Sequence, residues 1–392
     1  MRKLLVLLSA IALVVVFTVP ATAFESQFGG YWRTRMFSQT NFSGDDTESL
    51  DIMAVDTRTR IYYTAKFTDN VKLVNKFEWN SGWGDGVGGD IGTDGMGIFR
   101  IKNSYADFNL GPLNFKVGAH AAYLARGFWY DDDHMGLTAS YKTDAMTTTF
   151  YWIKAVEGGA GPDANDGDVD YYVVAPSFKV GIGAVKPWLA YEVSKATDLA
   201  AYDIGVDADL KFGAVALWFS GIMQGGDQAT DLSREGTLAA VGVSVPLGAV
   251  SVHGSVNYAT GDDPDTADTD EGFVAFSPYW VHAEILGPGV TDNGSSNNSP
   301  AGGGALTNLT AFNVGVSLSP MDKLKLKIDV WDATLNEEVG GETKLGTEVD
   351  IKATYKLVDN MNLDVVYAYL SAGDATGDTN PTEIAARLSI SF

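Results

Sequence analysis

The sequence predicts an all-β protein whose strands form one transmembrane, antiparallel, up-and-down β-barrel. Three observations lead to this fold class. Apolar and polar residues alternate with period two over segments of about 9–13 residues, a length that suits tilted membrane strands. Aromatic residues gather near the ends of these segments, and short connections alternate with long ones along the chain. A soluble sandwich also alternates, so the segment length, the aromatic placement and the connection pattern decide between the two.

Residues 1–23 are expected to be a signal peptide that is removed from the fold. Arg2 and Lys3 precede an apolar run, and Ala-Thr-Ala at 21–23 fits the small-x-small cleavage rule. A membrane anchor is the alternative, but the run is short for a helical span. The remainder, 24–392, shows no linker and no change of composition, so we expect a single barrel domain.

Segment 55–67 shows the alternation clearly. Ile61 and Tyr63 lie on one face of the expected strand, whereas Arg58 and Arg60 lie on the other. A Thr-Asp-Asn turn follows, since Asp and Asn close turns with their own side chains. The same pattern recurs further along the chain, at 71–79, 113–121, 322–330, 345–357 and 384–392.

The pattern predicts eighteen strands, with sixteen or twenty as the open alternatives. They are expected at 27–39, 54–67, 71–80, 98–109, 112–125, 134–142, 146–156, 169–179, 183–194, 200–212, 214–224, 235–246, 249–259, 308–318, 322–334, 345–357, 361–371 and 383–392. An even number places both chain ends on one side of the membrane, with the short, periplasmic turns. The long connections then share the extracellular rim. The twenty-strand alternative would use the stretch FVAFSPYWVHAEIL as an extra hairpin.

A spanning sheet must close, because hydrocarbon satisfies no backbone amide. A barrel of this size is too wide for side chains to fill, so water or a plug occupies it. Only a wet lumen accepts basic side chains, which cost about 2–4 kcal/mol each when they face lipid at mid-depth. We therefore predict a positive, pore-lining strip on one wall, formed by Arg33, Arg35, Arg58, Arg60, Lys66, Lys72, Lys76, Arg100, Lys102, Lys116 and Arg126. The other interpretation is that these residues solvate the wall or pair with Glu78 and Asp56.

The long connections are acidic and hold more than half of the 50 carboxylates. The Gly-rich connection 80–97 is a candidate for an inward loop whose Asp85, Asp90 and Asp94 would face the positive strip across a constriction. The connection 260–307 is the second candidate, either as an inward plug or as a surface loop. For its Ser/Asn/Gly-rich half we prefer the surface loop.

Composition excludes several classes of function. A net charge of −23 argues against nucleic acid as a partner, because phosphates require a basic face. The chain has no Cys, so it forms no disulfide and attaches no c-type haem. The acidic stretches 161–170 and 262–272 lack EF-hand spacing, and no G-x-S-x-G element is present. We expect no enzyme activity, no metal and no cofactor.

The chain resembles bacterial outer-membrane porins. The resemblance rests on YWRTR (31–35), on the hairpin VDTRTRIYYTAKFTDNVKLVNKFEW (55–79), on NSYADFNLGPLNFKVG (103–118) and on the ending ARLSISF (386–392). Within the porins, YADFNLGPLNFKVG and GFWYDDD (127–133) are similar to the alginate-export-like group. The terminal Phe392 resembles the signal that barrel-assembly machinery reads. The resemblance implies passive diffusion through an integral outer-membrane protein, commonly a homotrimer, in contact with lipid and lipopolysaccharide. It implies no substrate site.

The leading functional prediction is a water-filled channel for small hydrophilic solutes and ions. The acidic loops favour cations by field focusing, whereas the basic strip favours anions locally, and we expect a weak cation preference. The alternative is a structural or sheath barrel that holds a partner protein such as a cytochrome, or a surface adhesin. A soluble extracellular β-protein is a weaker third interpretation.

Overall fold

The computed structural model describes residues 24–45, 51–84, 98–158, 167–194, 197–280, 282–289, 295, 296, 299 and 304–392. Eighteen long strands run along the chain: β1 (Glu25–Thr40), β2 (Ile52–Thr68), β3 (Val71–Gly82), β4 (Ile98–Leu110), β5 (Leu113–Leu124), β6 (Tyr130–Lys142), β7 (Met146–Val156), β8 (Val169–Val180), β9 (Gly183–Ser194), β10 (Leu199–Phe212), β11 (Val215–Ala229), β13 (Thr237–Leu247), β14 (Val250–Ala259), β16 (Leu309–Met321), β17 (Leu324–Val339), β18 (Glu342–Val358), β19 (Met361–Ala372) and β20 (Thr382–Ser391). The shorter elements are η1 (Ala125–Gly127), β12 (Leu232–Arg234) and β15 (Thr269–Asp270).

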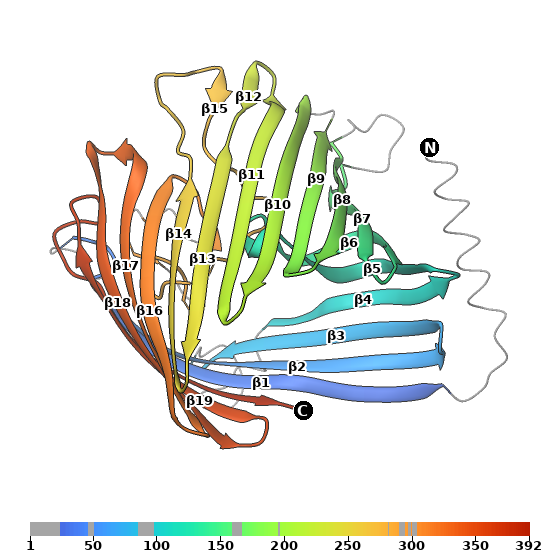
Figure 1. Cartoon of the computed structure of the whole chain (residues 1–392), viewed down its shortest axis with the longest axis horizontal. Coiled ribbons are helices and arrows are strands. Elements are labelled where there is room, and N and C mark those ends of the chain that lie inside the picture. The colour runs from blue at the N-terminus through green and yellow to red at the C-terminus, as the bar shows by residue number, and fades with distance from the viewer. Residues whose placement is uncertain are drawn as a thin grey trace.

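The long strands pair antiparallel with their neighbours and close into one ring (Figure 1). Closure comes from β1, which pairs with β2 on one side and with β20 on the other. The short strands β12 and β15 pair with each other in parallel, outside the order of the ring. The predicted fold class, an eighteen-strand barrel, is confirmed, and the predicted segments match the strands to within a few residues. Among the described residues, no helix is long and apolar enough to cross a membrane.

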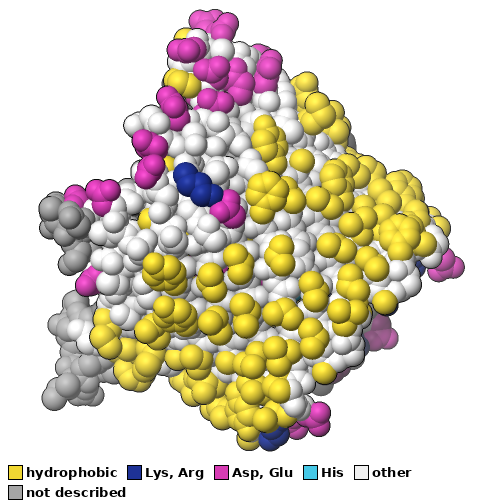
Figure 2. Space-filling model, turned by 60° about the vertical axis from the view of Figure 1, so that its left-hand side comes forward, with side chains coloured by type: hydrophobic (Ala, Val, Ile, Leu, Met, Phe, Trp, Pro, Cys, Tyr) yellow, Lys and Arg dark blue, Asp and Glu magenta, His cyan; other side chains and the backbone are white. Residues whose placement is uncertain are grey.

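The outer face of the ring is apolar, as the period-two pattern requires. In β19, Val365 and Tyr367 are exposed on the outside, whereas Val366 and Ala368 are buried on the inside. Figure 2 shows hydrophobic side chains covering the wall, with almost no charged groups among them. Such a surface matches a lipid-facing band.

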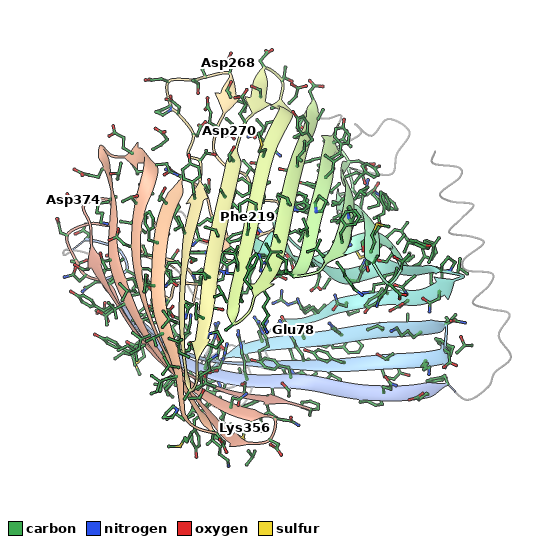
Figure 3. The ribbon with its side chains drawn as sticks, viewed as in Figure 1. Glu78, Phe219, Asp268, Asp270, Lys356 and Asp374 are labelled. Carbon is green, nitrogen blue, oxygen red and sulfur yellow. The ribbon has the colours of Figure 1, made fainter. Side chains whose placement is uncertain are left out.

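The connections at the two rims of the barrel differ in length and charge. Short turns join strands at one rim, for example between β2 and β3 at 69–70 and between β18 and β19 at 359–360. Both ends of the described chain lie at this short-turn rim, where Gly30 bonds to Phe392. At the opposite, long-loop rim, carboxylates gather at the top of Figure 2, and Figure 3 places Asp268 and Asp270 there.

Part of the longest connection runs inside the ring. The described residues of the stretch FVAFSPYWVHAEIL, 273–280 and 282–286, form no barrel hairpin, and this removes the twenty-strand alternative. Phe273, Trp280, Ile285 and Leu286 of this stretch are each at most 2% exposed. They pack against side chains that point inward from the strands, so this stretch occupies lumen space. The predicted signal peptide 1–23 lies outside the described residues.

Candidate pore-lining site

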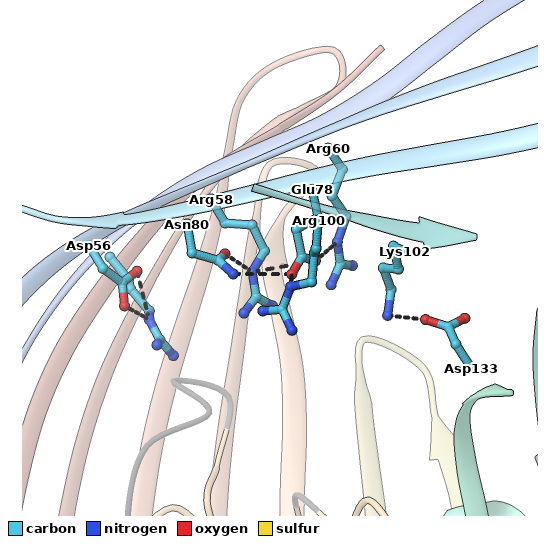
Figure 4. Close-up of polar contacts among 9 residues, drawn as sticks. Asp56, Arg58, Arg60, Glu78, Asn80, Arg100, Lys102 and Asp133 are labelled. Atoms are coloured by element: carbon cyan, nitrogen blue, oxygen red, sulfur yellow. Dashed lines mark hydrogen bonds and ion pairs between the residues drawn. The ribbon is translucent and has the colours of Figure 1, made fainter. Parts of the chain in front are cut away.

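A carboxylate shared by three guanidinium groups lies at the centre of the basic wall (Figure 4). Glu78 of β3 lies 2.5 Å from Nε of Arg60 and 3.7 Å from Nε of Arg58. Its other oxygen lies 3.0 Å from Nε of Arg100. Asn80 bridges the group by accepting from Arg58 at 2.6 Å and donating to Glu78 at 3.1 Å. One negative charge therefore faces three positive charges, and this part of the wall keeps a positive excess.

Strand register explains why these side chains meet. Arg60 lies opposite Glu78 in the β2–β3 pair, and Glu78 lies opposite Arg100 in the β3–β4 pair. Directly opposed residues on one face have side chains about 5 Å apart, which suits ion pairs. The sequence pattern placed Arg58 and Arg60 on one face, and the structure shows Glu78 on the same face.

The first strand continues the basic wall. Arg35 donates from Nε to both oxygens of Asp56, at 2.9 and 2.7 Å. Arg33 is buried and lies opposite Arg58 in the register. Asp56 and Glu78 thus form the ion pairs that the other interpretation expects. They do not neutralise the wall, because the guanidinium groups outnumber them.

The β4 part of the wall contains a bulge. Lys76 lies opposite Asn103 while Phe77 lies opposite Ile101, so Lys102 is the extra residue of the bulge. Lys102 and Asn103 consequently reach the same carboxylate, that of Asp133, and the Asn103 contact measures 2.6 Å. Figure 4 shows the Lys102–Asp133 pair beside the arginine group.

Two lysines of the wall face aromatic rings. Nζ of Lys76 lies 5.2 Å from the ring centre of Tyr62, and Nζ of Lys116 lies 5.9 Å from that of Tyr105. Within the described part of the chain, neither ammonium group forms an ion pair with a carboxylate. No carboxylate of the described residues therefore neutralises these two charges directly.

The remaining predicted residues lie apart from this group. Lys66 pairs with Asp69 at 2.8 Å at the short-turn rim, and this hydrogen bond lowers the pKa of Asp69 below its usual range. Lys72 pairs with Asp107 at 3.1 Å near the same rim. Arg126 does not lie on the basic wall.

Arg126 instead reaches a different part of the lumen. It belongs to η1, in a left-handed conformation with φ of 53°, and it contacts the carboxylate of Asp209 on β10. Its guanidinium lies 5.0 Å from the ring centre of Trp218. The connection between β5 and β6 is thereby folded inward against β10 and β11. Asp85, Asp90 and Asp94, the predicted constriction acids, lie outside the described residues.

Aromatic residues narrow the lumen next to this connection. Phe276 of the inward stretch stacks on Tyr171 at 3.8 Å and on Tyr130 at 5.0 Å between ring centres. Trp129 lies 5.8 Å from Phe276 and 5.1 Å from Trp188. Backbone bonds join the two connections, because Ser277 donates to Trp129 at 3.1 Å and Asp131 donates to Ser277 at 2.8 Å. Two connections that are far apart in sequence thus form one aromatic layer inside the barrel.

Sequence reasoning missed this aromatic layer. It left GFWYDDD as a connection between the predicted strands 112–125 and 134–142, although Phe128 and Trp129 are each only 1% exposed and point inward. The signal available in the sequence was the density of Trp, Tyr and Phe in 271–289, which is unusual for an exposed loop.

Comparisons with known proteins support the fold. No protein-family model and no curated protein sequence matches the chain. Solved structures do match. OpdK of Pseudomonas aeruginosa, determined with vanillate, matches with a TM-score of 0.65 and 11% identity over 94% of this chain and 98% of that chain. The outer membrane protein OprD of Pseudomonas aeruginosa matches with a TM-score of 0.61 and 10% identity over 94% of each chain.

A BenF-like porin from Pseudomonas fluorescens Pf-5 also matches, with a TM-score of 0.61 and 12% identity over 94% of this chain and 99% of that chain. These similarities do not support the narrower resemblance to alginate-export porins. They agree with the apolar outer wall and with the expected place of the chain in a bacterial outer membrane. The chain therefore has the fold of the bacterial outer-membrane porins of the OccK and OprD kind.

Proposed function

We propose that this protein is an outer-membrane diffusion channel for small hydrophilic solutes and ions. The observation that carries the proposal is the positive excess around Glu78, where three guanidinium groups share one carboxylate inside a closed barrel. Such an excess is tolerated next to water and is costly next to lipid or in a dry core. The wall is therefore suited to a hydrated path.

The finer proposal is that the channel favours solutes that carry a carboxylate. The ammonium groups of Lys76 and Lys116 each lie near a tyrosine ring. A planar carboxylate can bind an ammonium group while its apolar part contacts a ring. The similar OpdK structure was determined with vanillate, which is an aromatic carboxylate, and this supports the same class of solute here.

The expected cation preference belongs to a different part of the channel. Carboxylates gather at the long-loop rim, and this rim attracts cations from solution by its field. We assign the cation preference to that mouth and the carboxylate preference to the wall. A reversal potential of anion sign in a salt gradient would show that the wall governs small ions as well.

The test compares gluconate with neutral glucose, two solutes that do not cross lipid unaided, in liposomes that contain the purified protein. The double variant Lys76→Gln, Lys116→Gln is expected to lower gluconate entry about thirtyfold, since two ammonium groups at about 4 Å contribute about 1 kcal/mol each in water. Glucose entry should stay unchanged. The matched control, Lys323→Gln with Lys356→Gln, removes two exposed lysines at the short-turn rim, one from the turn before β17 and one near the end of β18, and should leave both rates unchanged.

Equal loss of gluconate and glucose entry would contradict the carboxylate preference. No entry of either solute through folded wild-type protein would contradict the channel itself. The alternative of a sheath around a partner protein has no supporting observation, because residues 273–280 of the chain itself occupy lumen space.

A further inference from the structure

One carboxylate of the barrel wall holds the inward stretch by its backbone. The side chain of Glu348 on β18 accepts hydrogen bonds from three consecutive backbone N–H groups, those of Glu284 at 2.8 Å, Ile285 at 2.8 Å and Leu286 at 2.7 Å. Glu348 itself is completely buried. Successive N–H groups that converge on one point form a nest, and a nest binds an anion.

A second wall residue holds the other end of the same stretch. Gln224 on β11 accepts from the backbone N–H of Val274 at 2.8 Å and donates to its carbonyl oxygen at 2.7 Å. Strands β11 and β18 are not neighbours in the ring. The chain is therefore attached to two separate parts of the wall, at residues 274 and 284. We call its described residues, 274–280 and 282–286, the strap.

The two attachments differ in chemistry. Gln224 is neutral and offers two ordinary hydrogen bonds, whereas Glu348 is a buried carboxylate with three donors, and charge-assisted bonds are about twice as strong. A buried carboxylate that loses such donors carries a large desolvation cost. The strap is thus held more strongly at its Glu348 end.

The surroundings of Glu348 make the nest necessary. Asp350, two residues along the same strand, is 4% exposed, and neither of its carboxyl oxygens has a hydrogen-bond partner among the described residues. An ionised carboxylate accepts hydrogen bonds and donates none, so Asp350 offers Glu348 no hydrogen-bond donor when both are charged. The three N–H groups of the strap supply the compensation that the wall itself lacks.

Apolar packing shows that this end of the strap is seated in the wall. Ala283, Ile285 and Leu286 are each at most 2% exposed. Trp280 meets Trp331 of β17 edge to face, with ring centres 5.7 Å apart. Removal of Glu348 would therefore loosen this end of a segment that fills lumen space.

We propose that Glu348 is the positioning residue that sets the width of the channel, by holding the 284–286 nest of the strap across the lumen. The proposal rests on the proposed channel function. Under this proposal the nest is a carboxylate-binding site, and the side chain of Glu348 occupies it. An added small carboxylate should take the same place when that side chain is removed.

The test uses Glu348→Ala, Glu348→Gln and the control Glu338→Ala, which removes an exposed carboxylate at the long-loop rim. Single-channel recordings in planar bilayers are expected to show a larger and noisier conductance for Glu348→Ala. Glu348→Gln should lie between this variant and wild type, because its amide keeps one acceptor oxygen. Added formate should return the Glu348→Ala conductance toward wild type and leave Glu338→Ala unchanged.

A second readout does not depend on transport. The chain has no Cys, so Ile285→Cys provides a single thiol in the strap. Labelling by a water-soluble maleimide is expected to be about tenfold faster when Glu348→Ala is also present. A tenfold change corresponds to a loss of about 1.4 kcal/mol in the free energy that holds the strap against the wall. Formate should slow this labelling again. If Glu348→Ala does not fold, Glu348→Gln carries both measurements.

Failures of the two proposals are distinguishable. Wild-type protein that conducts, combined with unchanged conductance and unchanged labelling in both Glu348 variants, overturns the role of Glu348. Wild-type protein that does not conduct, combined with faster labelling in Glu348→Ala, overturns the channel and leaves the nest in place. Faster labelling without any effect of formate overturns the carboxylate site.

Discussion

The backbone of Gly30 exchanges two hydrogen bonds with Phe392. Gly30 donates to the carbonyl of Phe392 at 2.8 Å, and Phe392 donates to the carbonyl of Gly30 at 3.1 Å. This exchange completes the pairing of the first and last strands at the short-turn rim. The ring of Phe392 lies across Gly30, so a Cβ added there would meet Cζ of that ring at 2.3 Å and the carbonyl of Arg60 at 2.6 Å.

Gly30→Ala should therefore weaken closure of the barrel. The carbonyl of Arg60 belongs to the paired strand and cannot rotate away, so the strand must shift, at a cost of about 1–3 kcal/mol. The measurement is reversible urea unfolding in lipid vesicles. Gly181→Ala is the matched control, because a Cβ there meets nothing within 4 Å. Equal stability of the two variants would show that Phe392 does not restrict this position.

Adjacent residues of β14 test which face touches lipid. Val256 is 37% exposed on the outer face, and Ser255 points inward. Val256→Arg should lower the free energy of unfolding by about 2–4 kcal/mol, the cost of Arg in the lipid-facing band, whereas Ser255→Arg should cost clearly less. Unfolding in vesicles measures both variants. The reverse order of stability would mean that the faces have been assigned the wrong way round.

Glu78→Gln should increase the anion preference of the channel. The substitution removes the carboxylate that three guanidinium groups share. One unit charge at about 10 Å changes the energy of an ion in water by about 0.4 kcal/mol, which is about twofold in local concentration. The reversal potential in a potassium chloride gradient measures the change.

The control for this prediction is Asp69→Asn, at an exposed turn on the short-turn rim, where the lost charge lies outside the narrow part of the lumen. A shift of the reversal potential as large in Asp69→Asn as in Glu78→Gln would show that the ions respond to net charge and not to the wall.

Phe276→Ala should widen the channel and destabilise the fold. The ring contacts Tyr171 and Tyr130 in the aromatic layer, so its removal opens space inside the barrel. We expect a larger single-channel conductance and a loss of about 3 kcal/mol of stability. Phe219→Ala, on the lipid-facing side of β11 (Figure 3), should leave the conductance unchanged. Unchanged conductance in Phe276→Ala would show that the path avoids this layer.

Local pattern was sufficient to predict the barrel and the basic wall. Period-two alternation assigned Arg58 and Arg60 to the inner face because β2 and β3 pair without a register shift from Asp56 to Lys66. The alternation is weak around Arg100 and Lys102, because the extra residue of the bulge at Lys102 interrupts it.

Long-range contacts could not be predicted in the same way. The strap is buried because Gln224 and Glu348, on distant strands, bind its backbone, and backbone donors leave no mark in the sequence. Arg126 was assigned to the wall of its own strands, but a left-handed turn directs it toward Asp209. That the acidic residues of the connection 80–97 face the positive strip stays a prediction.

The positive excess around Glu78 affects the composition of the solution inside the barrel. Fixed cations that outnumber fixed anions on one wall attract dissolved anions whenever the lumen is wet, as in an ion-exchange resin. Chloride, or whichever anion is abundant outside, would then be concentrated beside the arginines, and a solute carboxylate would enter by exchange for it.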